Sequence, residues 1–508
     1  MYCCSKEDEL IADMTSFGIH VGNTTACLAV SKEGKTDVVA SPTGDRTTPA
    51  VVAFSGAEVM VGLAAKQARL RNLPNTILNN KNLLVGRQAQ DWVDVSPVQI
   101  KQDNDKTYYQ VEFKEKDYKT TPVDVLVNIY RYILDIADSH SGADSVEDCT
   151  CVVTVPREYT EDQRSLIKAA ANKAGFKVAQ VISEAAAACL AYGLGQEDPG
   201  ERYHCLVFRC GGISTTLSVV LVSGGSFTIL ASEDISLGGD QATDVLVQYL
   251  GAEFKQKFKE DILCNKRGRA KLAAGAETVK HVLSTLDTAH CFVESLFDGM
   301  DFSSNVTRAR FDNQLSKFVS DVLSPISTLL TSLGLTTADI GKVVMAGGTS
   351  KIVKLQSALG GKFPNAEILT SLAPDEVVAI GAAVQASCIL HETSQAAREK
   401  MLSLSQDIVA AVDGDDGDKM TTLLAEDSTV PCKRSVTLSS TADSESVSVS
   451  VYWGRARDVI LAKLSLSSIS NKSKLMLSAH IHRDGSTHIT LADKSSGNTS
   501  DVMLKMGS

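Results

Sequence analysis

Apolar and polar residues follow the same pattern in two parts of the chain that are far apart. Residues 17–30 read FGIHVGNTTACLAV, and residues 206–220 read LVFRCGGISTTLSVV. In both, an apolar run leads into a turn with glycine and small hydroxylated residues, and a second apolar run follows. This pattern predicts two strands joined by a hairpin. Each hairpin alone is a weak signal, but the pair indicates a duplicated core.

Both predicted turns have the chemistry of an anion site. Glycine lets the backbone come close to a ligand, and the exposed N–H groups of such a turn form a concavity suited to negative charge. We therefore expect one phosphate-approaching turn from each half of the duplicated core.

Strands and helices alternate between the two hairpins. Residues 149–156 (CTCVVTVP) form a predicted strand, and a helix is expected from 162 to 174, ending at Gly175. A further strand at 178–182 and an alanine-rich helix at 184–192 follow. This order predicts a layered α/β domain. Downstream, residues 242–286 are expected to be mostly helical, and a strand at 342–348 enters a glycine turn and a helix through 358.

The pattern changes after about residue 390. We interpret residues 391–402 as a linker because they are polar and helix-permissive. Residues 443–453 (DSESVSVSVYW) alternate strictly, which predicts a half-buried strand. Residues 475–491 predict a hairpin with Asp484-Gly485 at its turn. We therefore expect a layered α/β domain at 14–390 and a small β domain at 403–508.

Composition and charge narrow the class of protein. The 508 residues, 44% hydrophobic and 22% charged, fit two or more globular domains. A net charge of −11 argues against a generic nucleic-acid surface, so no direct DNA partner is expected. No apolar stretch reaches the ~18–20 residues that cross a bilayer, and the acidic start is not a secretory signal. We interpret residues 1–13 as a tail or alternative start before Met14, and expect a cytosolic protein.

The cysteines do not predict a metal site. Twelve are scattered between Cys3 and Cys432, and none forms a C-x-x-C pair, so neither zinc nor thioredoxin-like chemistry is indicated. Cys149 and Cys151 alternate within an apolar run and are interpreted as part of a buried strand.

Nine stretches carry a resemblance to a known family. They are GDRTTPAVVAF (44–54), VGLAAKQ (61–67), PNTILNNKNLLVGR (74–87), DQRSLIKAAANKAGFKV (162–178), SEAAAACLAYGLG (183–195), SLGGD (236–240), NVTRARF (305–311), MAGGTSKI (345–352) and PDEVVAIGAAVQA (374–386). Together and in this order they resemble the heat-shock-70 chaperone family. The resemblance implies an actin-like domain of two lobes around a deep ATP-binding cleft, followed by a β-sandwich domain.

The resemblance also implies which residues bind ATP. Lys66 matches the family's lysine beneath the γ-phosphate, and the helix carrying Glu277 matches the family's ribose and adenine helix. The expected ATP-binding residues are Gly22, Asn23, Thr24, Thr25, Lys66, Arg209, Gly211, Gly212, Ile213, Ser214, Gly239, Glu277, Lys280, His281, Ser284, Gly347, Gly348, Thr349, Lys351 and Asp375. His281 and Lys351 stand where the family has arginines, which predicts weaker nucleoside affinity because lysine lacks a planar stacking surface.

Three carboxylates of the family's phosphate end are replaced, by His20, Arg209 and Thr216. Magnesium depends on nearby carboxylates. A cation at ~4 Å would instead repel it by about 4 kcal/mol at an effective dielectric of 20. Arg209 can pair with phosphate oxygens directly, whereas His20 can do so only if protonated and otherwise has a neutral structural role. We expect no protein metal site: nucleotide binding survives and water activation is lost.

Further departures concern coupling between the domains. Ala185 replaces the proline that follows the family's glutamate, and TSQAAREKMLSLS (393–405) replaces the acidic, leucine-rich linker. The chain ends where the family's β-sandwich closes, so the helical lid is missing. These departures argue against ATP-driven cycling of peptide affinity.

This combination most resembles the lidless members of the family that pair with a zuotin-type J-domain protein at the ribosome. The resemblance implies a heterodimer that acts on nascent chains and stimulates a separate, catalytically competent heat-shock-70 chaperone. Two alternatives stay open. One is an active ATPase chaperone that binds unfolded peptides; Lys66 and the retained threonines favour it. The other is a nucleotide-free scaffold, favoured by Lys351 and Ile213.

Overall fold

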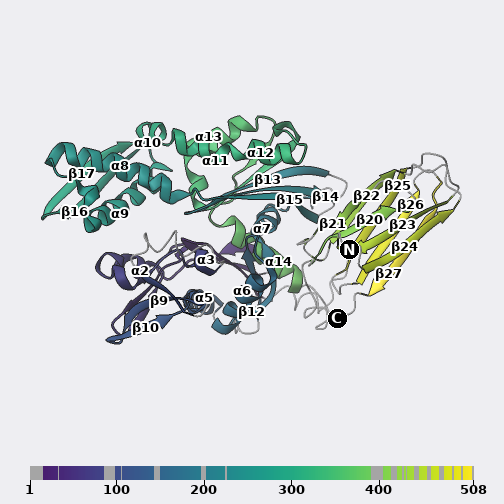
Figure 1. The fold of residues 1–508 in the computed structure, drawn as a ribbon, viewed down its shortest axis with the longest axis horizontal. Helices are drawn as coiled ribbons and strands as arrows, with labels where there is room; N and C mark the ends of the chain where they lie inside the picture. Colours follow the sequence, from purple (N-terminus) through teal and green to yellow (C-terminus); the bar gives the residue numbers. More distant parts are fainter. Residues whose placement is uncertain are drawn as a thin grey trace.

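The computed structural model describes residues 15–32, 34–84, 98–103, 106–141, 149–195, 202–223 and 226–390 and, with short interruptions, 404–505. The predicted tail (1–13) and linker (391–402) lie outside the described residues. Figure 1 shows two lobes one above the other, with the β domain beside them. None of the helices in the described part of the chain combines the length and the apolar run that crossing a bilayer requires.

The first lobe is built on a mixed sheet with strand order β12-β11-β1-β2-β3. Its strands are β1 (Ser16–Val21), β2 (Thr25–Lys32), β3 (Lys35–Val38), β11 (Thr150–Val155) and β12 (Lys177–Ser183), with β4 (Thr48–Pro49) pairing β2. Strand β1 runs antiparallel to β2 and parallel to β11. The helices of this lobe include α5 (Pro122–Ser141), α6 (Glu161–Ala174) and α7 (Glu184–Ala191).

The second lobe repeats this arrangement. Its sheet has the order β15-β14-β13-β18-β19, and β13 runs antiparallel to β14 and parallel to β18. Its strands are β13 (Arg202–Cys210), β14 (Thr215–Ser223), β15 (Ser226–Ile235), β18 (Ile340–Ala346) and β19 (Glu367–Leu369). The predicted duplicated core is confirmed, since each hairpin lies in the centre of its sheet with a parallel strand on its free side.

Small residues bring α7 and α14 (Val377–Leu390) close to the first hairpin. A Cβ atom on Gly18 of β1 would lie 2.0 Å from the Ala383 nitrogen, and one on Gly381 would lie 1.7 Å from the Ala187 carbonyl oxygen. No side chain fits at either glycine, because such distances are far inside van der Waals contact. Ser183 caps α7, because its Oγ accepts a hydrogen bond from the Ala186 N–H at 3.1 Å, and Glu184 is the first residue of the helix.

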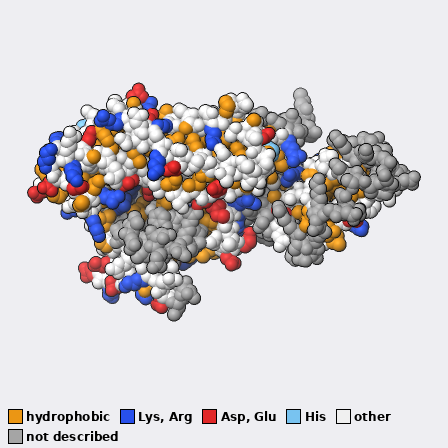
Figure 2. Space-filling model, turned by 45° about the horizontal axis from the view of Figure 1, so that its top comes forward, with side chains coloured by type: hydrophobic (Ala, Val, Ile, Leu, Met, Phe, Trp, Pro, Cys, Tyr) orange, Lys and Arg blue, Asp and Glu red, His pale blue; other side chains and the backbone are white. Residues whose placement is uncertain are grey.

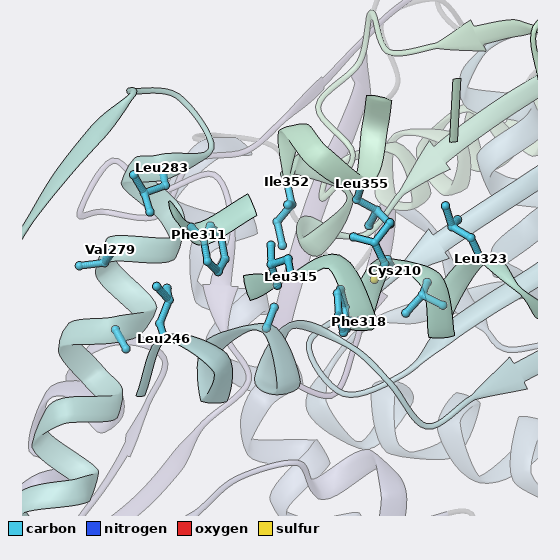
Figure 3. Packing of buried hydrophobic residues seen from close by; sticks show 14 of the residues in the cluster. Cys210, Leu246, Val279, Leu283, Phe311, Leu315, Phe318, Leu323, Ile352 and Leu355 are labelled. Carbon is cyan, nitrogen blue, oxygen red and sulfur yellow. The ribbon is translucent and has the colours of Figure 1, made fainter. Parts of the chain in front are cut away.

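Residues 242–286 are mostly helical, as predicted, and further helices follow in the second lobe. It contains α8 (Gly239–Phe258), α9 (Lys266–Leu283), the hairpin of β16 (Thr288–Phe297) and β17 (Met300–Thr307), α10 (Arg308–Gln314), α11 (Ser316–Leu323), α12 (Pro325–Ser332) and α13 (Val353–Lys362). Figure 3 shows Leu246 and Val279 packed in one apolar core with Phe311 and Leu315. That core anchors α9, one wall of the cleft described below.

The first lobe also contains two short helices, α2 (Leu63–Ala68) and α3 (Asn80–Leu84), and two small sheets. One sheet is formed by β5 (Val52–Ser55), β6 (Glu58–Val61) and β7 (Thr76–Ile77), and the other by β8 (Gln99–Asp103), β9 (Lys106–Phe113) and β10 (Lys116–Thr120). On the face that Figure 2 shows, basic and acidic side chains are interspersed over the two lobes.

The C-terminal part forms two four-stranded antiparallel sheets. Their orders are β21-β20-β23-β24 and β22-β25-β26-β27, with β20 (Ile408–Val412), β21 (Thr421–Leu424), β22 (Cys432–Ser439), β23 (Ser446–Trp453), β24 (Val459–Ser467), β25 (Lys474–Ile481), β26 (Ser486–Asp493) and β27 (Thr499–Lys505). Val449 and Leu477, one from each sheet, share one core, so the predicted β-sandwich is confirmed. The predicted turn at Asp484-Gly485 lies outside the described residues. Arg434 Nη1 donates to Thr228 Oγ1 of β15 at 2.9 Å and joins the sandwich to the second lobe.

Candidate functional site

A cavity of about 690 Å³ lies between the two lobes. It is lined by both hairpin turns, by α9 and by the glycine turn after β18. Every ATP-binding residue expected from the sequence lines it except Gly239. Gly239 lies just beneath, where its backbone N–H donates to the Gly211 carbonyl at 2.9 Å. The volume falls within the range of sites that enclose a nucleotide-sized ligand.

The two hairpin turns have the same geometry and face each other. The Gly22 N–H donates to the Thr25 carbonyl at 2.8 Å, and the Gly211 N–H donates to the Ser214 carbonyl at 2.9 Å. A Cβ atom on Gly212 would lie 2.5 Å from Thr24 Oγ1, so only glycine lets the turns approach this closely. Two loops of backbone N–H groups therefore meet at one end of the cavity, as an anion site requires.

A buried ionic network lies behind these turns. Lys81 Nζ is 2.9 Å from Glu184 Oε1 and donates to the Val21 carbonyl at 2.9 Å, and Arg209 Nε is 2.9 Å from Glu184 Oε2. Burial alone raises the pKa of Glu184, but the charges of Arg209 and Lys81 outweigh it and lower that pKa to about 2. Glu184 is therefore an anion paired with two cations.

The Arg209 guanidinium lies between the two turns. A Cβ atom on Gly211 would be 3.8 Å from Nη1, and one on Gly22 would be 3.9 Å from Nη2. Since Nε is held by Glu184, the two Nη groups are left directed toward the phosphate-type turns. A planar fork in this position matches the oxygens of a phosphate group.

His20 is neutral in this setting. Its Nδ1 lies 2.9 Å from Thr154 Oγ1, and the Thr154 hydroxyl donates to the Ile19 carbonyl at 3.4 Å. Nδ1 therefore carries the hydrogen, and Nε2 is left as an acceptor 3.5 Å from Arg209 Nη2. Burial lowers the pKa of His20 to about 3, with Glu184 opposing and Arg209 and Lys81 adding to the shift. Of the two roles left open by the sequence, the neutral structural one fits this geometry.

Thr216 does not face the large cavity. Its Oγ1 donates to Asp234 Oδ1 at 3.1 Å, and both residues line a smaller cavity of about 160 Å³ behind the second turn, together with Glu158. Burial raises the pKa of Glu158. The sequence analysis had not selected these two carboxylates, because neither stands in the hairpin motif.

Lys66 lines the cavity, and its ammonium is paired with a carboxylate of the opposite lobe. Its Nζ donates to Glu277 Oε1 at 3.0 Å and joins α2 of the first lobe to α9 of the second. The ammonium at the base of the first turn belongs to Lys81, which the sequence analysis did not select. Lys81 and Glu184 lie in two of the stretches that resemble the family, 74–87 and 183–195. This resemblance is the feature of the sequence from which both residues could have been selected.

Local hydrogen bonds and an ion pair also hold the walls of the cavity. Lys280 Nζ donates to the Gly239 carbonyl at 2.9 Å, Thr349 Oγ1 donates to the Gly211 carbonyl at 2.8 Å, and Lys351 Nζ lies 2.7 Å from Asp375 Oδ2. Two buried acceptors that line the cavity, Asn23 Oδ1 and Asp375 Oδ1, have no hydrogen-bond partner. Such orphaned atoms indicate that a polar ligand or water belongs there.

The donor set fits a nucleotide better than a magnesium ion held by the protein. Magnesium prefers carboxylate oxygens and water, and the turns offer His20 and Arg209 instead. In the described part of the chain, no three His, Cys, Asp or Glu side chains are grouped so as to hold a metal ion.

Comparison with known proteins agrees with this architecture. The model of the family described as "Hsp70 protein" matches residues 16–508. The chain is 38% identical to heat shock 70 kDa protein 14 of Danio rerio, over 97% of this chain and 99% of the relative. It is 37% identical to the human and Macaca fascicularis proteins of the same name, over 97% of this chain and all of each relative. The chain belongs to the heat-shock-70 family.

Proposed function

We propose that this chaperone-family protein binds ATP in the cleft between its lobes and hydrolyses it slowly or not at all. The observation that carries the proposal is the Arg209 guanidinium, held by Glu184 and directed between the two turns. A fixed cation in that position offers charge-assisted hydrogen bonds to phosphate oxygens without a carboxylate-bound metal. Magnesium supplies charge neutralisation in phosphoryl transfer; here Arg209 supplies part of it.

The same network argues against water activation. Phosphoryl transfer to water needs a group that orients the nucleophile and accepts its proton. Glu184 is ion-paired with Lys81 and Arg209, and a carboxylate with a pKa of about 2 is a weak base. Nucleotide would therefore act as a bound structural ligand, which stabilises the native state by mass action.

Membership of the heat-shock-70 family extends the proposal to partners. We infer a heterodimer with a zuotin-type J-domain protein in the cytosol, bound at the ribosome, that assists nascent chains by stimulating a separate heat-shock-70 chaperone. Within it, residues 14–390 would bind nucleotide, 391–402 would link the domains, and 403–508 would form a β domain for peptide or partner binding. Co-purification of endogenous protein with ribosomes and mass spectrometry of its partners would test this.

A single-turnover assay with labelled ATP and excess protein tests the central proposal. Bound and intact ATP, retained when EDTA replaces magnesium, is the expected result. Phosphate release within minutes would favour the active-ATPase alternative. Absence of both binding and nucleotide-induced thermal stabilisation would favour the scaffold.

Changing Arg209 to methionine should weaken ATP binding about tenfold. The variant keeps the length of the side chain and removes the charge-assisted hydrogen bonds, whose loss costs about 1.5 kcal/mol or more. Binding is measured by calorimetry in EDTA, with thermal unfolding as a check on folding. Arg209→Lys is the matched control: it keeps the charge but lacks the planar fork, so its affinity should lie between those of the other two. Equal affinity in all three proteins would remove Arg209 from the site.

One observation favours the active-ATPase alternative. Glu158 and Asp234 line the smaller cavity together with Arg209 and Ser214, where a water could be held behind the second turn. If slow hydrolysis is detected, Asp234→Asn should abolish it while leaving ATP affinity unchanged. Hydrolysis that survives both Asp234→Asn and Glu158→Gln would exclude this cavity as its source.

The ion pair between Lys66 and Glu277 predicts a modest effect on nucleotide release. It crosses the cleft, but the two side chains are 40% and 35% exposed, so it is worth only about 0.2–1 kcal/mol. Lys66→Ala should therefore raise the dissociation rate of a fluorescent ATP analogue by up to about fivefold, and less at high salt. Lys271→Ala, which removes a lysine that caps β16 carbonyls away from the cleft, is the control. A hundredfold effect would instead place Lys66 at the phosphates.

A further inference from the structure

A second cavity, of about 220 Å³, lies beside the cleft between the lobes. Lys66 and Glu277, whose ion pair joins the two lobes, line both the cleft and this cavity. The cavity continues into the first lobe, where Arg69 of a short 3-10 helix (Arg69–Arg71) and Asn82 of α3 line it. Sites for drug-sized ligands measure about 300–1,000 Å³. This cavity therefore suits a smaller molecule than the cleft does.

Two hydrogen-bond donors in this cavity lack a partner. In the described part of the chain, Arg69 Nε and Asn82 Nδ2 are buried and make no hydrogen bond. Neither residue lines the cleft, although Asn82 also lines the smaller cavity behind the second turn. Asn82 is only 4% exposed, so its amide is shielded from bulk solvent. Buried donors without a partner in the protein indicate an acceptor that a ligand supplies.

The charge of Arg69 is likewise only partly compensated. Burial lowers the pKa of its guanidinium, and the charges of Glu277 and Asp240 oppose that shift without cancelling it. An anion placed against Arg69 would stabilise the charged form. The acceptor that Arg69 and Asn82 require is therefore best supplied by a negatively charged group, such as a carboxylate.

Groups of the opposite kind line the same cavity. Asn23 Oδ1 is a buried acceptor without a hydrogen-bond partner among the described residues. Asp240 lines the cavity from the second lobe. Burial raises the pKa of Asp240, and the charges of Lys280 and Arg69 offset that increase only in part. A cation with hydrogens to donate would therefore be stabilised beside Asp240 and Asn23.

The first lobe supplies an apolar wall. Val51, Leu78 and Ile100 line the cavity, together with Tyr109. Tyr109 uses its hydroxyl hydrogen within the protein, where it donates to Asn80 Oδ1 at 3.0 Å. This wall therefore offers apolar contact, and a hydrocarbon group that covers it is removed from water.

We propose that this second cavity binds a free apolar α-amino acid. The carboxylate of the ligand accepts hydrogen bonds from Arg69 Nε and Asn82 Nδ2. Its ammonium group donates to Asn23 Oδ1 and to the Asp240 carboxylate, and its side chain covers the apolar wall. An anion alone would leave Asp240 without a counter-charge, and an amine alone would leave Arg69 without one. A zwitterion compensates both and joins the two lobes.

Calorimetry of the full chain with L-leucine, in buffer without nucleotide, tests the proposal. L-Valine and L-methionine extend the test to apolar side chains of other shapes. No saturable binding of any of the three at millimolar concentration would overturn the inference. Since nucleotide is absent, this result is independent of whether ATP binds as proposed above.

Two analogues of leucine test the recognition of both charges. 4-Methylpentanoic acid lacks the ammonium group, and L-leucinamide lacks the carboxylate. Each should bind at least about tenfold more weakly than L-leucine, because each loses charge-assisted hydrogen bonds. Equal affinity of 4-methylpentanoic acid would contradict the role of Asp240. Equal affinity of L-leucinamide would contradict the role of Arg69 and would point to the N-terminus of a peptide instead.

The Arg69→Met variant identifies the cavity. It should weaken L-leucine binding at least about tenfold and leave ATP affinity unchanged, because Arg69 lines the second cavity and not the cleft. Arg71→Met is the matched control, since Arg71 lies in the same short helix and is exposed, and it should change neither affinity. Thermal unfolding of all three proteins checks that they are folded. Leucine binding that survives Arg69→Met would place the ligand elsewhere and overturn the inference.

Discussion

Replacing Glu184 by alanine should cost about 3–5 kcal/mol of unfolding free energy. The substitution leaves Lys81 buried without a counter-charge and Arg209 nearly so, and removing one partner of a buried ion network usually costs this much. Urea unfolding followed at the helical band of circular dichroism is a suitable measurement, since the helices lie in the two lobes. The lower unfolding free energy should appear as a lower urea concentration at the midpoint, while the dependence of that free energy on urea concentration stays unchanged.

The comparison that isolates the charge effect is a triple variant, Glu184→Ala with Lys81→Met and Arg209→Met. If the cost arises from uncompensated charge, removing both cations should recover most of the lost stability, because a buried ion network can often be replaced by apolar groups at little net cost. If the triple variant is as unstable as the single one, the cavity left by the glutamate is responsible. ATP binding should nevertheless stay weak in the triple variant, because it lacks Arg209.

The network is also expected to contribute to acid sensitivity. The pKa of Glu184 is about 2 in the folded protein and about 4.5 ordinarily. The stability that ionised Glu184 contributes is therefore fully present above pH 4.5 and is lost as pH falls toward 2. In Glu184→Ala this part of the pH dependence should disappear. In the unmodified protein, this group should account for a loss of about 3 kcal/mol of unfolding free energy, and the loss is confined to the range between pH 4.5 and pH 2.

The duplicated core could be predicted from the sequence because it depends on local chemistry. Each hairpin is encoded by contiguous residues, with Gly22 and Gly211 at equivalent positions of their turns. The resemblance to a family then brought together segments that lie far apart in the chain. All but one of the residues selected in this way line the cleft, which reflects how strongly the turn motifs constrain the backbone.

The roles of Lys66 and Lys81 could not be predicted in the same way. Both lysines stand in polar segments next to apolar residues, and the sequence does not say which ammonium reaches the first turn. The choice depends on contacts across 103 residues to Glu184 and across 211 residues to Glu277. The anchoring of Arg209 likewise required Glu184, which had been noticed only because alanine follows it in place of proline.

The protonation state of His20 was also beyond the sequence. An exposed histidine at the same position would have a pKa near 6.5 and be partly charged at neutral pH. Burial beneath the turns, with Arg209 and Lys81 nearby, makes the neutral ring the stable form. Of the two replacements, Arg209 alone therefore carries the positive charge that the proposed function assigns to phosphate binding. That assignment has a consequence that can be measured.

His20→Asn should make the protein markedly less sensitive to mild acid. In the unmodified protein, His20 has a folded pKa of about 3 and an unfolded pKa of 6.5, so the unfolded state takes up a proton first. The contribution of the neutral ring is complete above pH 6.5 and declines as pH falls toward 3. Between pH 7 and pH 4.5 this amounts to about 3 kcal/mol, from two pH units at 1.36 kcal/mol each.

Asparagine can donate to Thr154 Oγ1 much as His20 Nδ1 does and does not titrate. Any effect of the substitution itself on the unfolding free energy is the same at both pH values. That effect cancels when the unfolding free energies at pH 7 and pH 4.5 are subtracted for each protein. Urea unfolding at pH 7 and pH 4.5 should therefore show the smaller acid loss in His20→Asn. An equal loss in both proteins would mean that His20 is already protonated in the folded state. In that case a second cation would stand beside Arg209, and phosphate binding would have to be attributed to both.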